Sequence, residues 1–437
     1  MIKYAAIPGL PDRSDYGDLS RLRPDEIYTL VRQDHRAQAA GRHEDLRIGD
    51  PGGLQSWAVP KFLPEVENVK RLAIQQPLHT WSYKDFQGRL KHGYGKGLVT
   101  KLEESPVVML KNTGDHLMFT RGDTKDAPIY SMIRTKNGAW LLSIKRKDQP
   151  PEIRSYSKEH FKSIPVDKVP ELVANGATVV PKIDGAGALA VLGKDGVRVF
   201  GINSNKAGDK PEYTDLIGGL RGIGVPEDLR GTVLRGEVFG QRNGRSIPPQ
   251  ELSGILNSTT RNALYKRKGD GIKLLMAGLA LNRNGVDEYD QQRVSDIISR
   301  LNSDKLALMP SYGGDKALEL LRRIGAGQSP LTSEGVVVHQ PGQRPVKAKF
   351  TDDSDVVIRD IFPADTKSDS RAGGFSYSLP GSAKVVGNVG TGFSHALLRE
   401  MLANPGAFIG RTARIKSQGQ YGSGAYRAPS FIAMKED

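Results

Sequence analysis

The chain has 437 residues and no cysteine, which excludes disulfides and thiolate metal sites. Its formal net charge of +14 favours a polyanionic partner, with nucleic acid ahead of acidic lipid because no basic amphipathic helix is evident. No apolar run approaches the ~20 residues of a membrane span, and the N-terminus lacks a secretory signal, so we expect a cytoplasmic protein without membrane attachment.

Short alternating apolar runs fill the chain up to about residue 150, and Gly and Asp turns separate them. This pattern predicts the strands of a small β-barrel. We assign the barrel to residues 29–150, after an N-terminal arm of residues 1–28. The charged, proline-containing stretch KRKDQPPEIRSYSKEH (145–160) reads as a linker. The runs that predict strands are SWAVPKF (56–62), VVMLK (107–111), HLMFT (116–120), SMIRT (131–135) and AWLLSIKRK (139–147).

Residues 151–350 comprise this linker and a block that mixes strands and helices. VSDIISRLNS (294–303) and DKALELLRRIG (315–325) have the apolar spacing of helices. Residues 351–437 return to short strands and glycine turns, which fits a five-stranded oligonucleotide-binding (OB) barrel. The predicted fold class is therefore multidomain α/β plus β. The strand-like runs of the middle block are ATVVPKI (177–183), ALAVL (188–192), VRVFGI (197–202), TVLRGEVFG (232–240), IKLLMAGLAL (272–281) and EGVVVH (334–339).

A lysine and an aspartate stand between two apolar runs in VVPKIDGAG (179–187), at Lys182 and Asp184. The plain alternative is a surface turn, since Asp-Gly is common in turns. The chemical interpretation is a nucleophilic amine that attacks the α-phosphorus of a nucleotide. Such a site also needs carboxylates for a divalent metal and further lysines to neutralise phosphates.

Those residue types follow downstream in order. Glu237 lies beside a glycine in VLRGEVFG, and Glu334 precedes a glycine at the head of an apolar strand. Lys347 and Lys349 are two residues apart, on one face of a predicted strand. Each alone is compatible with an ordinary strand end, a turn or a solvated face, whereas the ordered set favours a nucleotidyl-transfer site.

The order K-x-D-G, Gly-Glu, E-G-V-V and K-x-K resembles the covalent nucleotidyltransferases, specifically the ATP-dependent polynucleotide ligases. VVGNVGTGFS (385–394) is similar to the opening of the OB barrel in bacterial end-joining ligases. The resemblance implies a central nucleotidyltransferase domain of the ATP-grasp-like ligase type, using ATP with Mg²⁺ or Mn²⁺. By position it implies Lys182 as the lysyl-adenylate, Asp184 and Gly185 in the nucleotide motif, Glu237 and Glu334 at the metal, and Lys347 and Lys349 at the phosphates.

The chain departs from that family at four places. One is VFGINSNKAGDK (199–210), where the arginine common in the family is not evident. Gly187 stands where an arginine is usual, Gly278 and Leu279 where a Phe-Asp pair supplies an aromatic face to adenine, and His339 where a lysine closes the fourth motif. These changes alter the pocket wall and leave the nucleophile and carboxylates in place. The candidates to compensate are Lys206, Arg198 and Tyr213.

The stretch QDHRAQAAGRHEDLR (33–47) contains two histidines and several charged residues. A polar loop is the plain alternative. However, His43 and Asp45 in H-x-D lie on one face of a strand, a workable geometry for a divalent metal. His35 and His79 are candidates to complete the shell.

This first block resembles the 3′-phosphoesterase domain of bacterial end-joining DNA ligases, the ligase D group. The match runs through HEDLRI, SWAVPKF, HTWSYKDFQG, HGYGKGLV and GAWLLSIKRK. The spacing from His35 to His43 is two residues longer than usual, and the basic KHGYG (91–95) replaces an acidic segment, which should favour DNA contact. The resemblance implies Mn²⁺ held by His35, His43 and Asp45, with Arg47, His79 and Tyr83 around the phosphate.

Both resemblances together predict an ATP-dependent DNA ligase that seals 5′-phosphate/3′-OH breaks through lysyl-AMP and heals 3′ ends with its first domain. We expect a monomer acting on duplex DNA with nicks or ends, separate end-joining proteins as partners, and Arg427 and Lys435 helping the last domain to close over ATP. One alternative is an active phosphoesterase with a degenerate ligase domain as a DNA clamp. Others are a non-catalytic DNA-end-binding scaffold, and RNA sealing or cap formation.

Overall fold

The computed structural model places most of the chain in two compact units. One unit comprises Met1–His160 and Asp184–Met309, and the other Phe161–Ile183 and Pro310–Asp437, so the chain crosses between them three times. None of the helices among the described residues is long and apolar enough to cross a membrane. The structure describes residues 16–67, 69–93, 95–124, 127–145, 149–154, 156, 161–204, 209–283, 286–340, 343–364 and 371–435.

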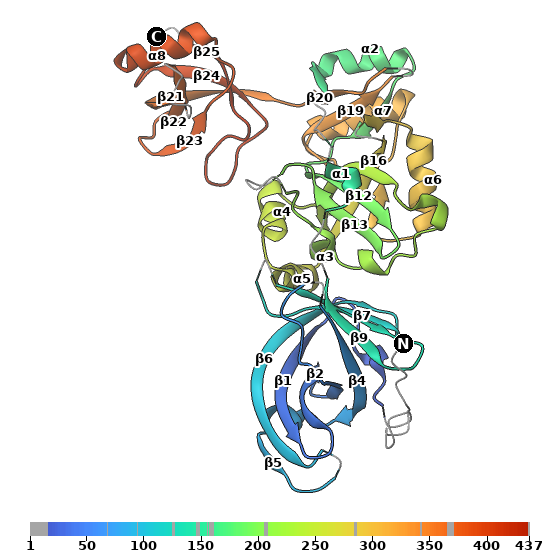
Figure 1. Cartoon of the computed structure of the whole chain (residues 1–437). Coiled ribbons are helices and arrows are strands. Elements are labelled where there is room, and N and C mark those ends of the chain that lie inside the picture. The colour runs from blue at the N-terminus through green and yellow to red at the C-terminus, as the bar shows by residue number, and fades with distance from the viewer. Residues whose placement is uncertain are drawn as a thin grey trace. The chain divides into compact units, whose positions relative to one another are not determined.

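The N-terminal part of the first unit is a nine-stranded sheet in the order β1-β2-β3-β4-β9-β8-β7-β6-β5. Because β1 also pairs with β6, eight of these strands close into a ring, visible in Figure 1 below α5. Inward-facing side chains such as Trp57 and Trp140 fill its core. The strands are β1 (Ile27–Ala37), β2 (Gly41–Asp50), β3 (Gly53–Val59), β4 (Lys70–His79), β5 (Gly88–Leu90), β6 (Gly97–Asn112), β7 (His116–Thr120), β8 (Ile129–Arg134) and β9 (Trp140–Ile144).

The rest of the first unit is a seven-stranded mixed sheet whose main path is β13-β12-β14-β16-β17. Its apolar core packs against helices, including α6, whose buried Val294, Ile297 and Leu301 follow helical spacing. The strands are β12 (Ala186–Gly193), β13 (Gly196–Gly201), β14 (Val233–Arg242), β15 (Arg245–Ser246), β16 (Ile272–Arg283), β17 (Val286–Glu288) and β18 (Leu306–Leu308). The helices are α1 (Pro151–Arg154), α3 (Thr214–Ile217), α4 (Pro249–Leu256), α5 (Thr260–Gly269) and α6 (Gln291–Leu301).

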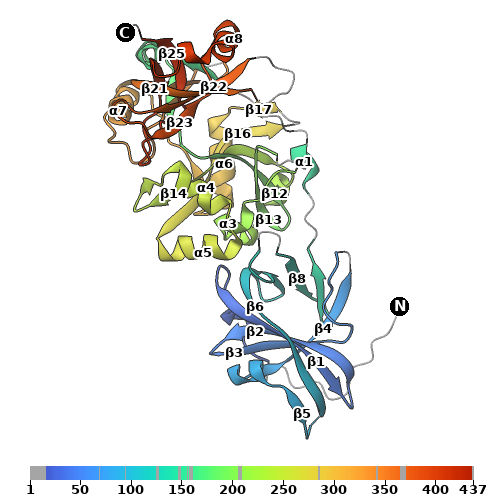
Figure 2. The ribbon, with the colours of Figure 1, turned by 90° about the vertical axis from the view of Figure 1, so that its left-hand side faces the viewer.

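The second unit holds a four-stranded sheet, β10-β20-β19-β11, packed against α2 and α7, and a five-stranded sheet, β23-β22-β21-β24-β25, with α8. Figure 2 gives a second view of the five-stranded sheet, with α8 beside it. The strands are β10 (Lys162–Ile164), β11 (Thr178–Pro181), β19 (Gly335–His339), β20 (Val346–Lys349), β21 (Asp352–Pro363), β22 (Ala372–Ser378), β23 (Val385–Val389), β24 (Thr412–Ser417) and β25 (Ser430–Met434). The helices are α2 (Val169–Ala174), α7 (Gly314–Gly325) and α8 (His395–Ala403).

The strands and helices predicted from apolar periodicity are confirmed at most positions, including α6 and α7. The described part of the predicted linker is more than a connector, because α1 forms there and buries Ile153. Tyr156 is also buried, and both side chains pack with Leu189 and Phe200. The five strands of the last block match the predicted number, while its identification as an OB fold stays a prediction.

Candidate functional sites

The antiparallel register of β1 and β2 assembles the first candidate site. His35 lies opposite His43, and Gln33 lies opposite Asp45. Residues 38–40 form the turn between the strands, so the longer spacing from His35 to His43 is absorbed by the hairpin. Because side chains alternate along a strand, His43, Asp45 and Arg47 share one face of β2.

Two histidine lone pairs and a carboxylate converge in this hairpin. Nε2 of His35 lies 2.7 Å from the Gly95 carbonyl and Nδ1 of His43 lies 3.0 Å from the Gly41 carbonyl, so these two nitrogens donate. The other ring nitrogens point at Asp45: Nδ1 of His35 at 3.1 Å and Nε2 of His43 at 3.4 Å. Carbonyl partners that fix the tautomer of a ligating histidine are typical of metal sites.

The donor set fits a divalent cation. The three ligand atoms of His35, His43 and Asp45 lie within 4.8 Å of one another, and all three residues are buried. Burial works to raise the pKa of Asp45, but hydrogen bonds from the histidines and the charge of Arg47 hold it far below its usual value. For His43, burial opposes protonation, and Asp45 outweighs it, so its pKa is raised. A cation at this place would lie between the two ring nitrogens and the Asp45 carboxylate that face one another.

Arg47 is held beside this group by three directional hydrogen bonds. Its Nε donates to Gln33 (2.8 Å), one Nη to Ser56 (2.8 Å) and the other to Asp45 (3.0 Å). Its guanidinium also lies over the Tyr83 ring, 4.7 Å from the centroid. The sequence interpretation missed Gln33 and Ser56. The period-two spacing of Gln33 from His35 is the signal that could have identified it.

His79 and Tyr83 come from the end of β4 and the 3-10 helix Trp81–Asp85. Their rings meet edge to face at 4.8 Å. Burial, reinforced by the positive charge of Arg47, lowers the pKa of His79 to about 4, so this imidazole is neutral at pH 7. All six residues predicted for the first site therefore lie in one cluster.

The second candidate site centres on the buried carboxylate of Glu334. Lys182 Nζ lies 2.7 Å from one oxygen and Lys349 Nζ 2.6 Å from the other. Burial would raise the pKa of Glu334, but the two lysines keep it below its usual value. Lys347 lies two residues from Lys349 on β20. Of the predicted residues, the structure thus brings Lys182, Glu334 and Lys349 into direct contact within the second unit.

The glycine after Glu334 is required by the sheet. Gly335 has a φ of +149°, and a Cβ there would lie 2.0 Å from the Ala348 carbonyl oxygen. Its own carbonyl accepts a hydrogen bond from the Lys182 N–H at 2.9 Å. Glycine therefore lets β19 approach its neighbours closely at the point where the Glu334 carboxylate and the Lys182 amine meet.

The remaining residues of the nucleotide motifs belong to the first unit. Glu237 on β14 lies opposite Gly187 on β12. A Cβ at Gly185 would lie 2.6 Å from the Val238 carbonyl, so this glycine also permits a close approach. Asp184 is the residue at which the chain returns to this unit from the second one.

The structure gives physical reasons for two departures. A Cβ at Gly187 would lie 2.9 Å from Cδ1 of Ile202, so isoleucine fills the space there. At Gly278 a Cβ would lie 2.9 Å from Ile298 and 3.1 Å from Val294, both on α6. That face of β16 therefore packs in the core, and an aromatic ring at 278 has no room to cover a base.

The three proposed compensating residues differ in placement. Arg198 makes a two-pronged ion pair with Glu212, at 2.8 and 3.1 Å. Tyr213 is half-buried, and Lys206 lies outside the described residues. His339 is half-buried and burial lowers its pKa. In the last block, Lys435 pairs with Asp355.

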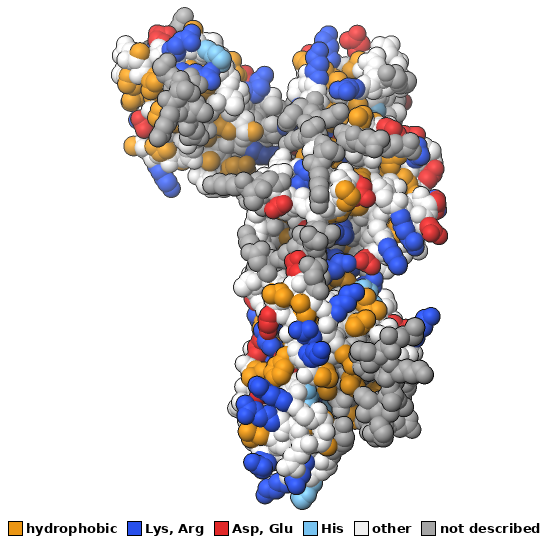
Figure 3. Space-filling model, in the orientation of Figure 1, with side chains coloured by type: hydrophobic (Ala, Val, Ile, Leu, Met, Phe, Trp, Pro, Cys, Tyr) orange, Lys and Arg blue, Asp and Glu red, His pale blue; other side chains and the backbone are white. Residues whose placement is uncertain are grey.

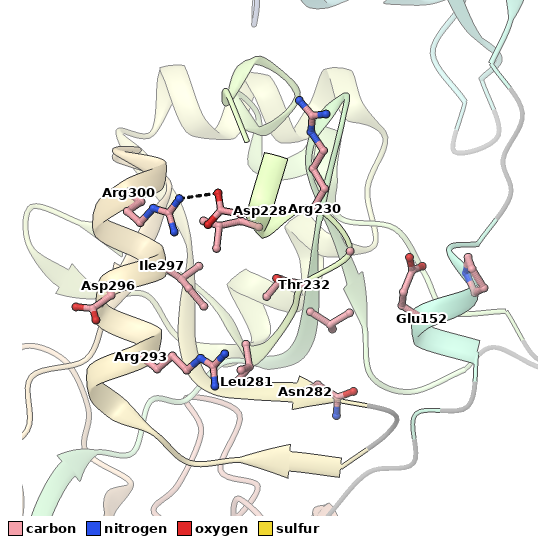
Figure 4. A pocket seen from close by; sticks show the side chains of 14 residues that line it. Glu152, Asp228, Arg230, Thr232, Leu281, Asn282, Arg293, Asp296, Ile297 and Arg300 are labelled. Atoms are coloured by element: carbon pink, nitrogen blue, oxygen red, sulfur yellow. Dashed lines mark hydrogen bonds and ion pairs between the residues drawn. The ribbon is translucent and has the colours of Figure 1, made fainter. Parts of the chain in front are cut away.

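A pocket of about 960 Å³ in the first unit contains none of these residues (Figure 4). Arg293 and Arg300 project into it from α6, and Arg300 is paired with Asp228 at 2.7 Å. Glu152 and Asp296 offset the remaining positive charge. Such mixed charge does not single out a ligand. Lys and Arg side chains are likewise scattered over the face seen in Figure 3.

Comparison with known proteins finds similarity to DNA ligase D proteins. Residues 33–116 match the family described as the DNA ligase D 3′-phosphoesterase domain. The multifunctional non-homologous end joining DNA repair protein LigD of Mycobacterium tuberculosis is 26% identical over 403 residues, covering 86% of this chain and 49% of its own length. LigD of Pseudomonas aeruginosa is 32% identical over 154 residues, 33% of this chain and 18% of that protein. The chain thus spans at most about half the length of these relatives.

Solved structures of DNA ligases also resemble part of the chain. A Lig E DNA ligase covers 64% of it at 16% identity, with a TM-score of 0.44. A mycobacterial DNA ligase D complexed with ATP covers 60% at 19% identity, with a TM-score of 0.29.

Proposed function

We propose that this chain is an ATP-dependent DNA ligase that also heals 3′ ends. The observation that carries the sealing activity is the contact of Lys182 and Lys349 with the two oxygens of buried Glu334. This arrangement supplies a nucleophile, a metal-binding carboxylate and a phosphate-neutralising cation in one place. Similarity to LigD over most of the chain supports DNA as the substrate.

In the first step, the Lys182 amine attacks the α-phosphorus of ATP. An N–P bond forms, the bond from that phosphorus to the pyrophosphate oxygen breaks, and the amine loses its proton. Lys347 and Lys349 bind phosphate oxygens, and Glu334 is a candidate ligand of Mg²⁺ or Mn²⁺, which would neutralise charge on the phosphates. Glu237, in the first unit, is a separate candidate for binding the metal. AMP then passes to a 5′-phosphate, and the 3′-OH displaces it to form the phosphodiester.

Intact-protein mass spectrometry after incubation with ATP and magnesium tests the first step. We expect the wild type to gain the mass of one AMP and Lys182→Ala to gain none. Lys168→Ala, which changes an exposed lysine of the same unit, is the matched control and should load normally. If the wild type gains no nucleotide from ATP or any other nucleoside triphosphate, the ligase proposal is wrong.

For the first site we propose removal of a 3′-terminal phosphate or ribonucleotide, leaving the 3′-OH that sealing requires. His35, His43 and Asp45 would hold Mn²⁺, which polarises the phosphoryl oxygens. Arg47, neutral His79 and Tyr83 would contact the phosphate. The match of residues 33–116 to the phosphoesterase family and the converging lone pairs support this role.

Two measurements test the first site. Mn²⁺ should raise the melting temperature of the wild type but not of Asp45→Asn, because binding to the folded state stabilises it. Duplex DNA with a 3′-phosphate should lose that phosphate with the wild type only. Asp115→Asn, at an exposed carboxylate in the turn between β6 and β7, is the control. A wild-type response in Asp45→Asn would contradict the assignment.

We further propose that the chain works as a monomer on nicked or broken duplex DNA, with other end-joining proteins as separate partners. The five-stranded sheet of the last block would be an OB fold that clamps the duplex, with Arg427 and Lys435 contributing positive charge. The net charge of +14 supports this preference for a polyanion.

A further inference from the structure

A threonine that belongs to none of the nucleotide motifs ties the two halves of the Lys182–Glu334 contact together. Thr332 is 5% exposed and precedes β19. Its hydroxyl donates to the Lys182 carbonyl at 2.5 Å and accepts from the Glu334 N–H at 2.9 Å. One side-chain oxygen thus joins two backbone groups that lie 152 residues apart in the sequence.

The backbone needs this hydroxyl because the strand pairing stops there. The paired residues of β11 and β19 end at Pro181 and Val336, and the last backbone bond between the segments runs from the Lys182 N–H to Gly335. Beyond it, the Lys182 carbonyl and the Glu334 N–H bond the hydroxyl of Thr332, which takes the place of a further rung of the ladder. Without the hydroxyl, both groups would lose this bond in a buried setting.

We propose that Thr332 is a positioning residue for nucleotidyl transfer, which fixes the backbone of Lys182 and Glu334 so that amine and carboxylate meet in one geometry. This inference rests on the proposed function of Lys182. Misplacing a reacting group by about 1 Å can cost on the order of 100-fold in rate. Since Thr332 touches neither ion-pairing atom, its effect reaches the reaction through Lys182 and Glu334.

The test measures the rate of lysyl-AMP formation by intact-protein mass spectrometry across a range of ATP concentrations and pH. Thr332→Val keeps the shape and removes the hydroxyl, whereas Thr332→Ser keeps the hydroxyl and removes the methyl group. Thr178→Val, in β11 of the same sheet, is the matched control. Melting temperatures of all variants are measured alongside, and rates are compared well below the lowest of them.

We expect Thr332→Val to load AMP at least about tenfold more slowly at saturating ATP, with little change in the KM for ATP and with an altered pH–rate profile. Thr332→Ser should load within about threefold of the wild type. Loading by Thr332→Val at the wild-type rate would overturn the inference. So would equal losses in the serine and valine variants, since these would point to packing of the methyl group.

Should Thr332→Val not fold, Thr332→Ala is compared with Thr332→Ser on the same terms. Failure of this inference alone is recognised by a wild type that loads AMP normally together with valine and alanine variants that do the same. If the wild type itself never loads AMP, the proposed function and the inference both fall.

Discussion

At the scale of single residues, Arg47 illustrates how shape as well as charge specifies a site. Its three donors reach Gln33, Ser56 and Asp45 in different directions, which a lysine ammonium cannot reproduce. We expect Arg47→Lys to lower 3′-phosphatase activity by at least about tenfold and the free energy of unfolding by about 1–3 kcal/mol. Arg89→Lys on the exposed face of β5 is the control, measured by the same urea titration and phosphate release; equal effects would contradict this account.

The neutral state of the His79 ring leads to a separate prediction about how the free energy of unfolding depends on pH. Its folded pKa of about 4 lies below the ordinary value of 6.5, so the neutral ring stabilises the fold fully above pH 6.5. This contribution is lost as the pH falls from 6.5 through 4. We therefore expect the unfolding free energy of the wild type, relative to His79→Gln, to decrease over this window by on the order of 1–3 kcal/mol. A difference that stays constant with pH would show that the ring does not titrate this way.

At this scale the sequence predicted the charged residues of the two sites better than the polar residues that hydrogen-bond to them. His43 and Asp45 followed from strand alternation, Arg47 from the resemblance to the phosphoesterase domain, and Lys182 and Glu334 from motif order. Gln33, Ser56 and Thr332 did not, because they act through neighbours that are distant in sequence. A threonine or serine carries no local signal of such a partner, and the only signal for Gln33 is its two-residue spacing from His35.

At the scale of elements, β16 allows a test of which face of a strand has room for a larger side chain. Gly278 faces Ile298 and Val294 of α6, so Gly278→Phe would place a ring in the core of the first unit. We expect a loss of about 2–4 kcal/mol in the free energy of unfolding and no gain in ATP affinity. The control is Leu279→Phe, at a half-buried position beside the irregular pairing of β14 and β16. This change should lower the free energy of unfolding by less than about 1.5 kcal/mol. Urea denaturation measures both, and a stable Gly278→Phe variant that binds ATP more tightly would contradict the packing argument.

Elements with clear periodicity were predicted well, and those without it were not. α6 and α7 follow apolar spacing, whereas α4 and α5 were not predicted. α5 contains the run Lys266–Lys268 and has only two buried side chains, Ala263 and Leu264. A nearly uniform polar helix gives a weak period, so its formation depends on tertiary contacts that the sequence does not display.

At the scale of the whole molecule, two sites on one chain predict complementation. Asp45→Asn should lose healing but keep AMP loading, and Lys182→Ala should do the reverse, because the sites share no residue. A nick with a 3′-phosphate should then be sealed by the wild type or by a mixture of both variants, but by neither variant alone. Gel analysis of labelled nicked DNA measures this, with a 3′-OH nick as the control that Asp45→Asn seals. Failure of the mixture would mean that healing and sealing must occur on one chain.

The excess of positive charge gives another prediction at this scale. If binding neutralises about six phosphates, the affinity for duplex DNA should fall on the order of a thousandfold between 50 and 200 mM salt. Fluorescence anisotropy measures this with a short labelled duplex. An affinity that is independent of salt would argue against DNA as the polyanion that the charge favours.

The ring of strands and the Lys182–Glu334 contact are completed at different times while the chain is being synthesised. The ring of strands is complete once residue 144 has been made, whereas Lys182 waits for Glu334 and Lys349. At ribosomal rates of about 5–20 residues per second, the stretch from residue 144 to residue 349 takes roughly 10–40 seconds. During this time Lys182 is an ordinary lysine on an unfinished sheet. A chain interrupted before residue 334 would therefore carry the β1–β2 hairpin but lack the carboxylate that the proposed AMP loading at Lys182 requires.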